Sequence, residues 1–314
     1  NIGVDLGGRR IIKKFSGSYL DQYGVIPNNR YTRLNFRLSN TTKIGKYIEV
    51  MPSINYIGSE NRKPLRSGGG YMNSLIMWPV DDDIRNFQDP SGGKRALFSA
   101  NANSDFDNPF WNVYNNRSGD VTDRYIASLG ININPTKWLS LSGRFGYDTY
   151  KTDGFTIYHP QSFYISSAVN GTLDNYYRRY KGYNHTITAT AKKSIGQFNG
   201  RAMVGTMWQD YETRMFSVTG NGLSVVGNTD SSNTSPNTRV RLLRNNFGEY
   251  NRSVIRQFAY FGEFSVNWKN QIFLTYTHRF EQASTLPEAN RKYNYPGASV
   301  SAILSDIIPA IKKT

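Results

Sequence analysis

The sequence predicts an all-β protein, and within that class an antiparallel up-and-down transmembrane β-barrel. Aromatic residues make up 14% of its 314 positions, with 22 Tyr and 17 Phe, although only 38% are hydrophobic in total. This composition suits strands and turns better than a soluble core, which draws more on Leu, Ile, Val and Ala. The other two observations are the alternation of apolar and polar residues within segments and the order of the connection lengths.

Eleven segments have the character of β-strands, and most of them approach the roughly 9–11 residues that a tilted spanning strand needs. An apolar run of eighteen residues, which a transmembrane helix would need, is missing, but spanning strands never produce one. The chain has no cysteine, which excludes a disulfide scaffold and thiolate metal sites. The predicted strands span residues 1–8, 12–21, 31–41, 46–57, 124–134, 137–149, 184–194, 198–211, 256–268, 271–281 and 296–304.

Apolar and polar residues alternate within these segments, which predicts one apolar face and one polar face for each strand. A slip of one residue would exchange the two faces, so the pattern predicts the whole set together. We expect the following side chains to point out of the barrel: Leu139, Leu141, Phe264, Val266, Ile272 and Leu274. We expect the opposite set to face the lumen, because charges are costly in a dry core: Ser140, Ser142, Arg33, Arg37, Arg144, Glu263 and Arg279.

The connections between the predicted strands alternate strictly between short and long. The short ones are 9–11, 42–45, 135–136, 195–197 and 269–270, and the long ones are 22–30, 58–123, 150–183, 212–255 and 282–295. In an up-and-down barrel, alternate connections lie at the same end, so all the long loops fall at one rim. Short periplasmic turns and long extracellular loops are typical of outer-membrane barrels. The sequence therefore predicts one barrel domain over residues 1–314, located in the bacterial outer membrane, with extracellular loops at 58–123, 150–183 and 212–255.

Three stretches resemble the barrel of SusC/RagA-type TonB-dependent outer-membrane transporters, a family found in Bacteroidetes-like bacteria. The first, "FSGSYLDQYGVIPNNRYTRLNFRLSNTTKIGKYIEVMPSINY", is similar to the first barrel strands of the family. The second joins the Asn-Pro of "NPFWNVYNN" to the hairpin "YIASLGININPTKWLSLSGRFGYDTY". The third, "YFGEFSVNWKNQIFLTYTHRFEQASTLPEANRKYNYPGASVS", contains the hairpin, the Leu-Pro-x-x-Asn-Arg loop and the aromatic-Pro return strand.

The resemblance implies a nutrient importer that binds, encloses and releases glycans or peptides without covalent chemistry or a cofactor. In that family a plug domain blocks the lumen, a SusD-like lipoprotein covers the extracellular loops, and the TonB system pulls on the plug. Residues 1–314 correspond to about the first half of a barrel of about 22 strands. We therefore expect an open sheet of eleven strands, with the plug and the remaining strands supplied from outside these residues. The alternative is a structural or adhesive outer-membrane barrel without a transport cycle.

The side chains that carry chemistry do not point to an enzyme. His159, His185 and His278 lie in different segments, without the carboxylate spacing of a zinc site or a catalytic triad. A calcium site at Asp81, Asp82, Asp83 and Asp89 is weighed against the favoured interpretation of a solvated acidic turn, because the spacing is not that of an EF-hand. Three aromatic residues in the first long loop are candidates for stacking on a ligand, with packing of the loop on itself as the alternative: Tyr71, Trp78 and Trp111.

The formal net charge is +15 at pH 7. Such a balance often indicates nucleic acid binding, but no compact basic and aromatic motif occurs, so we expect no nucleic acid partner. The cations are scattered over strands and loops. Those outside the lumen are expected to meet outer-membrane lipid, the phosphates of lipopolysaccharide or an acidic partner; a solvated surface is the alternative.

Overall fold

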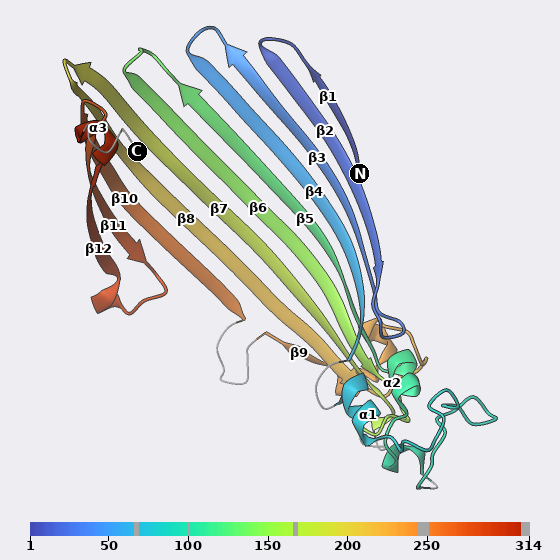
Figure 1. The fold of residues 1–314 in the computed structure, drawn as a ribbon. Coiled ribbons are helices and arrows are strands. Elements are labelled where there is room, and N and C mark those ends of the chain that lie inside the picture. Colours follow the sequence, from blue (N-terminus) through green and yellow to red (C-terminus); the bar gives the residue numbers. More distant parts are fainter. Residues whose placement is uncertain (66–68, 100, 166–168, 244–250, 309–314) are drawn as a thin grey trace.

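The computed structural model describes residues 1–65, 69–99, 101–165, 169–243 and 251–308. Eleven strands lie side by side in chain order and form one antiparallel, curved sheet (Figure 1). A three-residue strand, β9 (Val240–Leu242), pairs with β8 outside this order. The predicted all-β, up-and-down architecture is therefore confirmed. The eleven strands are β1 (Ile2–Gly7), β2 (Ile11–Tyr23), β3 (Arg30–Ile44), β4 (Ile48–Pro64), β5 (Arg117–Ile133), β6 (Leu139–Tyr158), β7 (Thr172–Ile195), β8 (Phe198–Asn221), β10 (Arg252–Trp268), β11 (Ile272–Ala283) and β12 (Lys292–Ala302).

Helices are short and lie at the ends of the sheet. Helices α1 (Tyr71–Met77) and α2 (Pro109–Asn115) pack on each other in the connection between β4 and β5. No helix in the described ranges is long and apolar enough to cross a membrane. The remaining helical elements are α3 (Leu304–Ile307) and the 3-10 turns η2 (Ala102–Ser104), η4 (Ser231–Asn233), η5 (Pro236–Thr238) and η6 (Glu288–Asn290).

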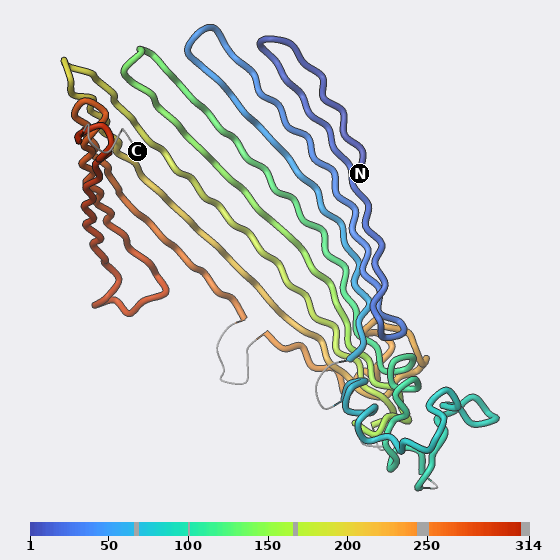
Figure 2. The backbone as a smooth tube through the Cα atoms, viewed as in Figure 1, coloured from blue at the N-terminus to red at the C-terminus, as the bar shows by residue number. Residues whose placement is uncertain are grey.

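The sheet is open. Strands β1 and β12 form its two edges, and within the described ranges no pairing joins them. The backbone trace in Figure 2 shows the same two strands on opposite sides of the sheet. This agrees with the expectation that these residues do not close a barrel among themselves.

The pairing register separates an apolar face from a polar face. Leu139 on β6 is aligned across β7 and β8 with Phe264 on β10, and Phe264 is aligned with Tyr276 on β11. Because cross-strand partners point to the same side, all six residues predicted to point outward share this apolar face. Ser140, Ser142, Arg33, Arg37, Arg144, Glu263 and Arg279 share the other, polar face. That the polar face lines a lumen remains a prediction.

Large apolar side chains are exposed along the apolar face. Val204 is 63% exposed, Phe264 52% and Val300 72%. Soluble proteins rarely expose contiguous apolar surface on this scale. Contact with lipid explains the exposure, because a spanning strand turns alternate residues to the hydrocarbon.

The long connections all lie at one end of the sheet and the tight turns at the other, as predicted (Figure 1). The tight connections are residues 8–10, 45–47, 134–138, 196–197 and 269–271. At the last of these, Lys269 and Asn270 both have positive φ, 51° and 57°, and Gln271 N donates to Trp268 O at 2.9 Å. This is the geometry of a type I′ turn, whose twist matches that of the flanking strands.

The strands extend further toward the loop end than the sequence predicts. Strands β7 and β8 have 24 residues each, more than twice the roughly 9–11 needed to cross a bilayer. The predicted loops 58–123, 150–183 and 212–255 shorten accordingly to 65–116, 159–171 and 222–251. The error has a physical cause. Beyond the lipid, both faces of a strand meet water or protein, so the apolar alternation ends before the hydrogen-bonded ladder does.

The assignment of faces predicts different effects for substitutions at the same height on β10 and β11. In the full-length protein, Phe264→Arg places a charge in the middle of the apolar face, where arginine costs about 2–4 kcal/mol in outer-membrane barrels. Thr275→Arg, the matched control, lies at the same height on β11 and places the same side chain on the polar face, opposite Ser265 and Ser299; it is expected to be tolerated. Reversible folding into lipid vesicles, followed by denaturant titration, measures both. Equal destabilisation by the two substitutions would contradict the assignment.

Candidate functional site

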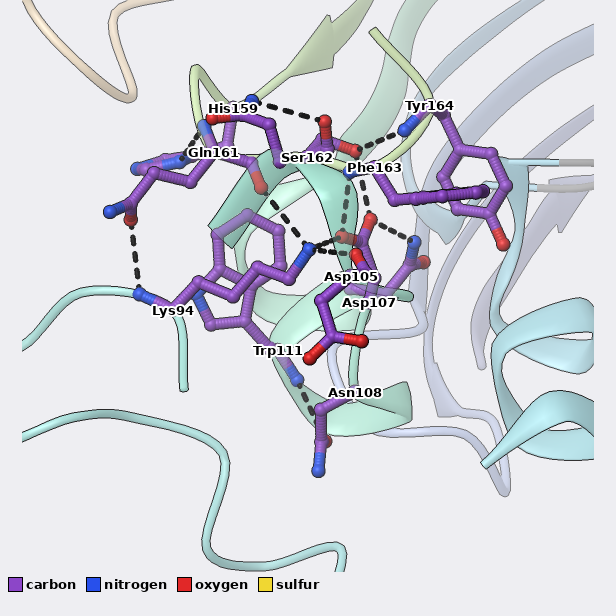
Figure 3. Close-up of polar contacts among 12 residues, drawn as sticks. Lys94, Asp105, Asp107, Asn108, Trp111, His159, Gln161, Ser162, Phe163 and Tyr164 are labelled. Atoms are coloured by element: carbon purple, nitrogen blue, oxygen red, sulfur yellow. Dashed lines mark hydrogen bonds and ion pairs between the residues drawn. The ribbon is translucent and has the colours of Figure 1, made fainter. Parts of the chain in front are cut away.

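The connections 65–116 and 159–171, the first and second of the three longest, meet at the loop end in a cluster of buried polar residues, which we call the loop cluster (Figure 3). It contains Lys94, Asp105, Asp107, helix α2, Asn116 and residues 159–164. The sheet positions it, because Arg117 at the start of β5 pairs with Ile157 near the end of β6. Asn116 and His159 lie just outside that pair, and His159 N donates to Asn116 Oδ1 at 3.0 Å.

Asp107 is the centre of the loop cluster and has no solvent-exposed surface. Its Oδ1 accepts hydrogen bonds from Lys94 Nζ at 2.7 Å and from Phe163 N at 2.9 Å. Its Oδ2 accepts from Asn116 Nδ2 at 2.9 Å, Ser162 Oγ at 2.8 Å and Asn112 Nδ2 at 3.3 Å. Five donors therefore saturate one carboxylate, which offers about four lone-pair sites, and they come from both long connections.

Lys94 supplies the compensating charge and is itself fully buried. Its ammonium group donates to Asp107 Oδ1, to Asp105 O at 2.6 Å and to Gln161 O at 3.3 Å. Burial lowers the pKa of Lys94, and the negative charge of Asp107 opposes this shift. A buried pair of this kind stabilises a conformation only when the remaining donors and acceptors are also satisfied, and in this cluster three acceptors meet the three protons of the ammonium group.

Helix α2 presents Trp111 to this charge pair. Asn108 Oδ1 caps the helix by accepting from Phe110 N at 2.8 Å, and Pro109 follows at the first helical position, an arrangement that favours helix initiation. Trp111 is 1% exposed; its ring lies 5.5 Å from Lys94 Nζ and packs edge-on against His159 at 4.9 Å. Burial lowers the pKa of His159, whose Nδ1 accepts from Gln161 N at 3.1 Å.

The acidic turn is organised by its own cations and amides. Asp82 forms an ion pair with Arg95 at 2.6 Å, which lowers the pKa of Asp82, and it also accepts from Trp78 Nε1 at 3.0 Å. Asp83 pairs with Arg85 at 2.9 Å. Asp89 closes a turn by accepting from Gly93 N at 2.9 Å. Within the described residues, no three acidic, His or Cys side chains are grouped so that they could hold a metal ion.

The three aromatic residues proposed to contact a ligand have different environments. Trp78 is 5% exposed and Trp111 1% exposed, so both pack the first loop on itself, which is the alternative that the sequence left open. Tyr71 is half-buried at the start of α1 and lines a cavity of about 330 Å³ together with Asn29 and Lys63. Contact of any of the three with a ligand remains a prediction.

The polar face carries ion pairs that the sequence did not predict. Glu263 pairs with Arg201 across β8 and β10, and Arg279 pairs with Glu281 at 2.6 Å. By contrast, Arg33, Arg37 and Arg144 form no ion pair with a described residue, so they are free to face another partner on the polar side. Two more pairs on this face join β4 to β5 and β5 to β6: Lys63–Asp120 and Arg124–Asp148.

We expect Lys94→Met to loosen the loop cluster without unfolding the sheet. Removing one member of a buried ion pair leaves the other charge uncompensated and costs about 3–5 kcal/mol. Hydrogen exchange of the full-length protein is expected to show lost protection in both 65–116 and 159–171. Arg85→Met is the control, because it breaks a solvent-exposed pair, which contributes little to stability. Unchanged protection in Lys94→Met would show that the pair does not join the loops.

Comparison with known proteins gives no match among protein-family models and none among curated proteins. Solved structures do match. The RagAB peptide transporter gives a TM-score of 0.79 at 17% sequence identity, over 98% of this chain and 34% of that chain. The RagAB peptide importer in the open-open state gives a TM-score of 0.75 at 17% sequence identity, over 94% of this chain and 32% of that chain. BauA, the ferric preacinetobactin receptor from Acinetobacter baumannii, gives a TM-score of 0.52 at 12% sequence identity, over 95% of this chain and 41% of that chain.

The chain thus spans about a third of the length of the RagAB chains that it matches. The correspondence extends along almost all of its own residues, including the end of the sheet that carries the long loops. The similarity to the RagAB barrel is greater than the similarity to BauA. The fold of this chain is that of the outer-membrane β-barrel of TonB-dependent transporters.

Proposed function

We propose that the protein is a TonB-dependent outer-membrane nutrient importer of the SusC/RagA type, which takes up peptides or glycans with a SusD-like surface lipoprotein. The proposal rests on one observation, the match of 98% of this chain to the RagAB peptide transporter with a TM-score of 0.79. This chain covers only 34% of the matched chain, so the function of the whole protein is itself part of the proposal.

The two sides of the sheet suit such a transporter. The apolar face provides the lipid contact, and the polar face offers Arg33, Arg37 and Arg144 to a hydrated lumen or to a plug domain. In this proposal the protein carries out no covalent chemistry: it binds, encloses and releases the nutrient. The TonB system would act through a plug domain inside the barrel.

Helix α1 offers a contact surface for the lipoprotein at the loop end. Its outer side carries Met72, Leu75, Ile76 and Met77, which are 57%, 38%, 75% and 45% exposed. Four exposed apolar residues on a seven-residue helix are unusual on a surface that faces water, and such patches mark interaction sites. The buried polar contacts of the loop cluster support the neighbouring helix α2, against which α1 packs.

Nutrient uptake by the native host tests the proposal. We expect deletion of the gene to abolish uptake of labelled oligopeptides or oligosaccharides, and the full-length gene to restore it. A proton ionophore is expected to stop uptake in the complemented strain, because TonB uses the proton-motive force. Uptake that survives gene deletion or the ionophore would favour the structural or adhesive alternative, which loss of surface attachment in the deletion strain would then support.

The lipoprotein contact is tested separately by Ile76→Asp in the full-length protein. Burying the new carboxylate in an apolar interface is unfavourable, so we expect much less lipoprotein to co-purify with the barrel after mild detergent extraction. Val80→Asp is the control, since Val80 is also exposed but lies beyond α1. If the two variants retain equal amounts of lipoprotein, α1 is not the contact.

A further inference from the structure

A row of four cations crosses the sheet beyond the apolar face, toward the loop end. Lys151 on β6 is the cross-strand partner of Arg179 on β7, Arg179 is the partner of Arg214 on β8, and Arg214 is the partner of Arg252 on β10. Each of the four lies an even number of residues from an apolar-face position on its own strand. The row therefore points to the outside of the sheet, away from the polar face.

Like charges placed directly opposite each other destabilise neighbouring strands, so the row needs compensation. Some compensation is internal: Glu212 pairs with both Arg214 and Arg252, and Lys151 pairs with Asp153 at 2.5 Å. Asp123 on β5 is the cross-strand partner of Lys151 and adds a third carboxylate at the β5 end of the row. Arg179, in the middle of the row, has no ion pair with a described residue. Its neighbour on the same face, Lys181, has none either. The row and the position next to it thus hold an excess of positive charge.

The height of the row relative to the membrane follows from the aromatic residues below it. Phe145 and His185 pack at 6.0 Å on the same face, and Tyr147 and Tyr183 pack at 4.8 Å one step higher. Aromatic belts of this kind lie at the membrane–water interface. Lys151 is four residues beyond Tyr147, which corresponds to roughly 13 Å along the strand and roughly 10 Å along the membrane normal for a strand tilted by about 40°.

The row therefore lies just above the hydrocarbon, in the leaflet on the side of the long loops, which is the extracellular side in such barrels. The polar lipid groups at that level in a bacterial outer membrane are phosphates and sugars of lipopolysaccharide. Arginine is well suited to phosphate, because its planar guanidinium donates two parallel hydrogen bonds. We propose that Lys151, Arg179, Arg214 and Arg252, together with Lys181, form a binding surface for the phosphate groups of lipopolysaccharide. This proposal depends on the outer-membrane fold and not on the transport function.

The test measures binding of lipopolysaccharide to the purified full-length protein in nanodiscs. Arg179→Gln is expected to weaken binding about fivefold, and the triple variant with Arg214→Gln and Arg252→Gln about a hundredfold, on the scale known for basic residues near anionic membranes. Enzymatically dephosphorylated lipopolysaccharide is expected to bind the unaltered protein as weakly as intact lipopolysaccharide binds the triple variant. Arg178→Gln is the matched control: it lies at the same height on β7 but on the polar face.

Three results would overturn the proposal. The first is equal binding of intact and dephosphorylated lipopolysaccharide, and the second is an equal loss in Arg178→Gln and Arg179→Gln. The third is full competition by inorganic phosphate at low concentration, which would indicate a site for a soluble anion instead. Heat-modifiable electrophoretic mobility of each variant shows whether the barrel has folded, and the single variant Arg179→Gln provides the comparison if the triple variant does not fold.

Discussion

Continuous cross-strand pairing is the constraint on which the rest of this structure depends. Hydrocarbon offers no partner to a backbone N–H or C=O group, and each unpaired group costs several kcal/mol there. The ladder must therefore run from strand to strand, and the eleven strands from β1 to β12 are paired in this way. It has an interruption between β3 and β4, where Asn40 and Thr41 lie opposite Pro52 and Met51. Once the ladder is fixed, so are the faces: a slip of one residue would move Phe264 to the polar face and Glu263 into the lipid.

Beyond the lipid, the same strands remain paired, and contacts between side chains stabilise them. Tyr150, Tyr180 and Tyr211 stack across β6, β7 and β8 at 4.9 and 6.2 Å, and cross-strand aromatic pairs of this kind add about 0.2–1 kcal/mol each. At the end of these strands, Ile157, Leu173 and Leu223 form a small buried core. The sheet thus extends well above the membrane and carries the loops, so part of the segment that the sequence predicts to be loop is a hydrogen-bonded extension of the sheet.

Most of the fold could be predicted from the sequence because its determinants are local. Alternation is visible within each strand, and the order of short and long connections determines which end each loop occupies. The strand ends could not be predicted, because the alternation of apolar and polar residues indicates where a strand contacts lipid, whereas the backbone pairing between strands continues beyond the lipid. The loop cluster was missed for another reason: Lys94 and Asp107 belong to one connection, but their partners Gln161, Ser162 and Phe163 belong to another. An Asn-Pro pair such as that at 108–109 is typical of a helix start, but spacing alone could not indicate a buried ion pair that depends on contacts between loops.

The loop cluster is in turn a consequence of the register. Pairing of Arg117 with Ile157 places the end of the first long connection beside the start of the second, and Asn116 joins them through His159 N and Asp107. A charge pair buried at this junction allows very few arrangements of the two segments, because any other arrangement would leave Lys94 or Asp107 without partners in a region that excludes water. The sheet therefore fixes more than the path through the membrane. It also determines where helix α2 lies, and helix α1 packs against α2. The exposed apolar side of α1 is therefore positioned by the same backbone pairing that satisfies the N–H and C=O groups in lipid.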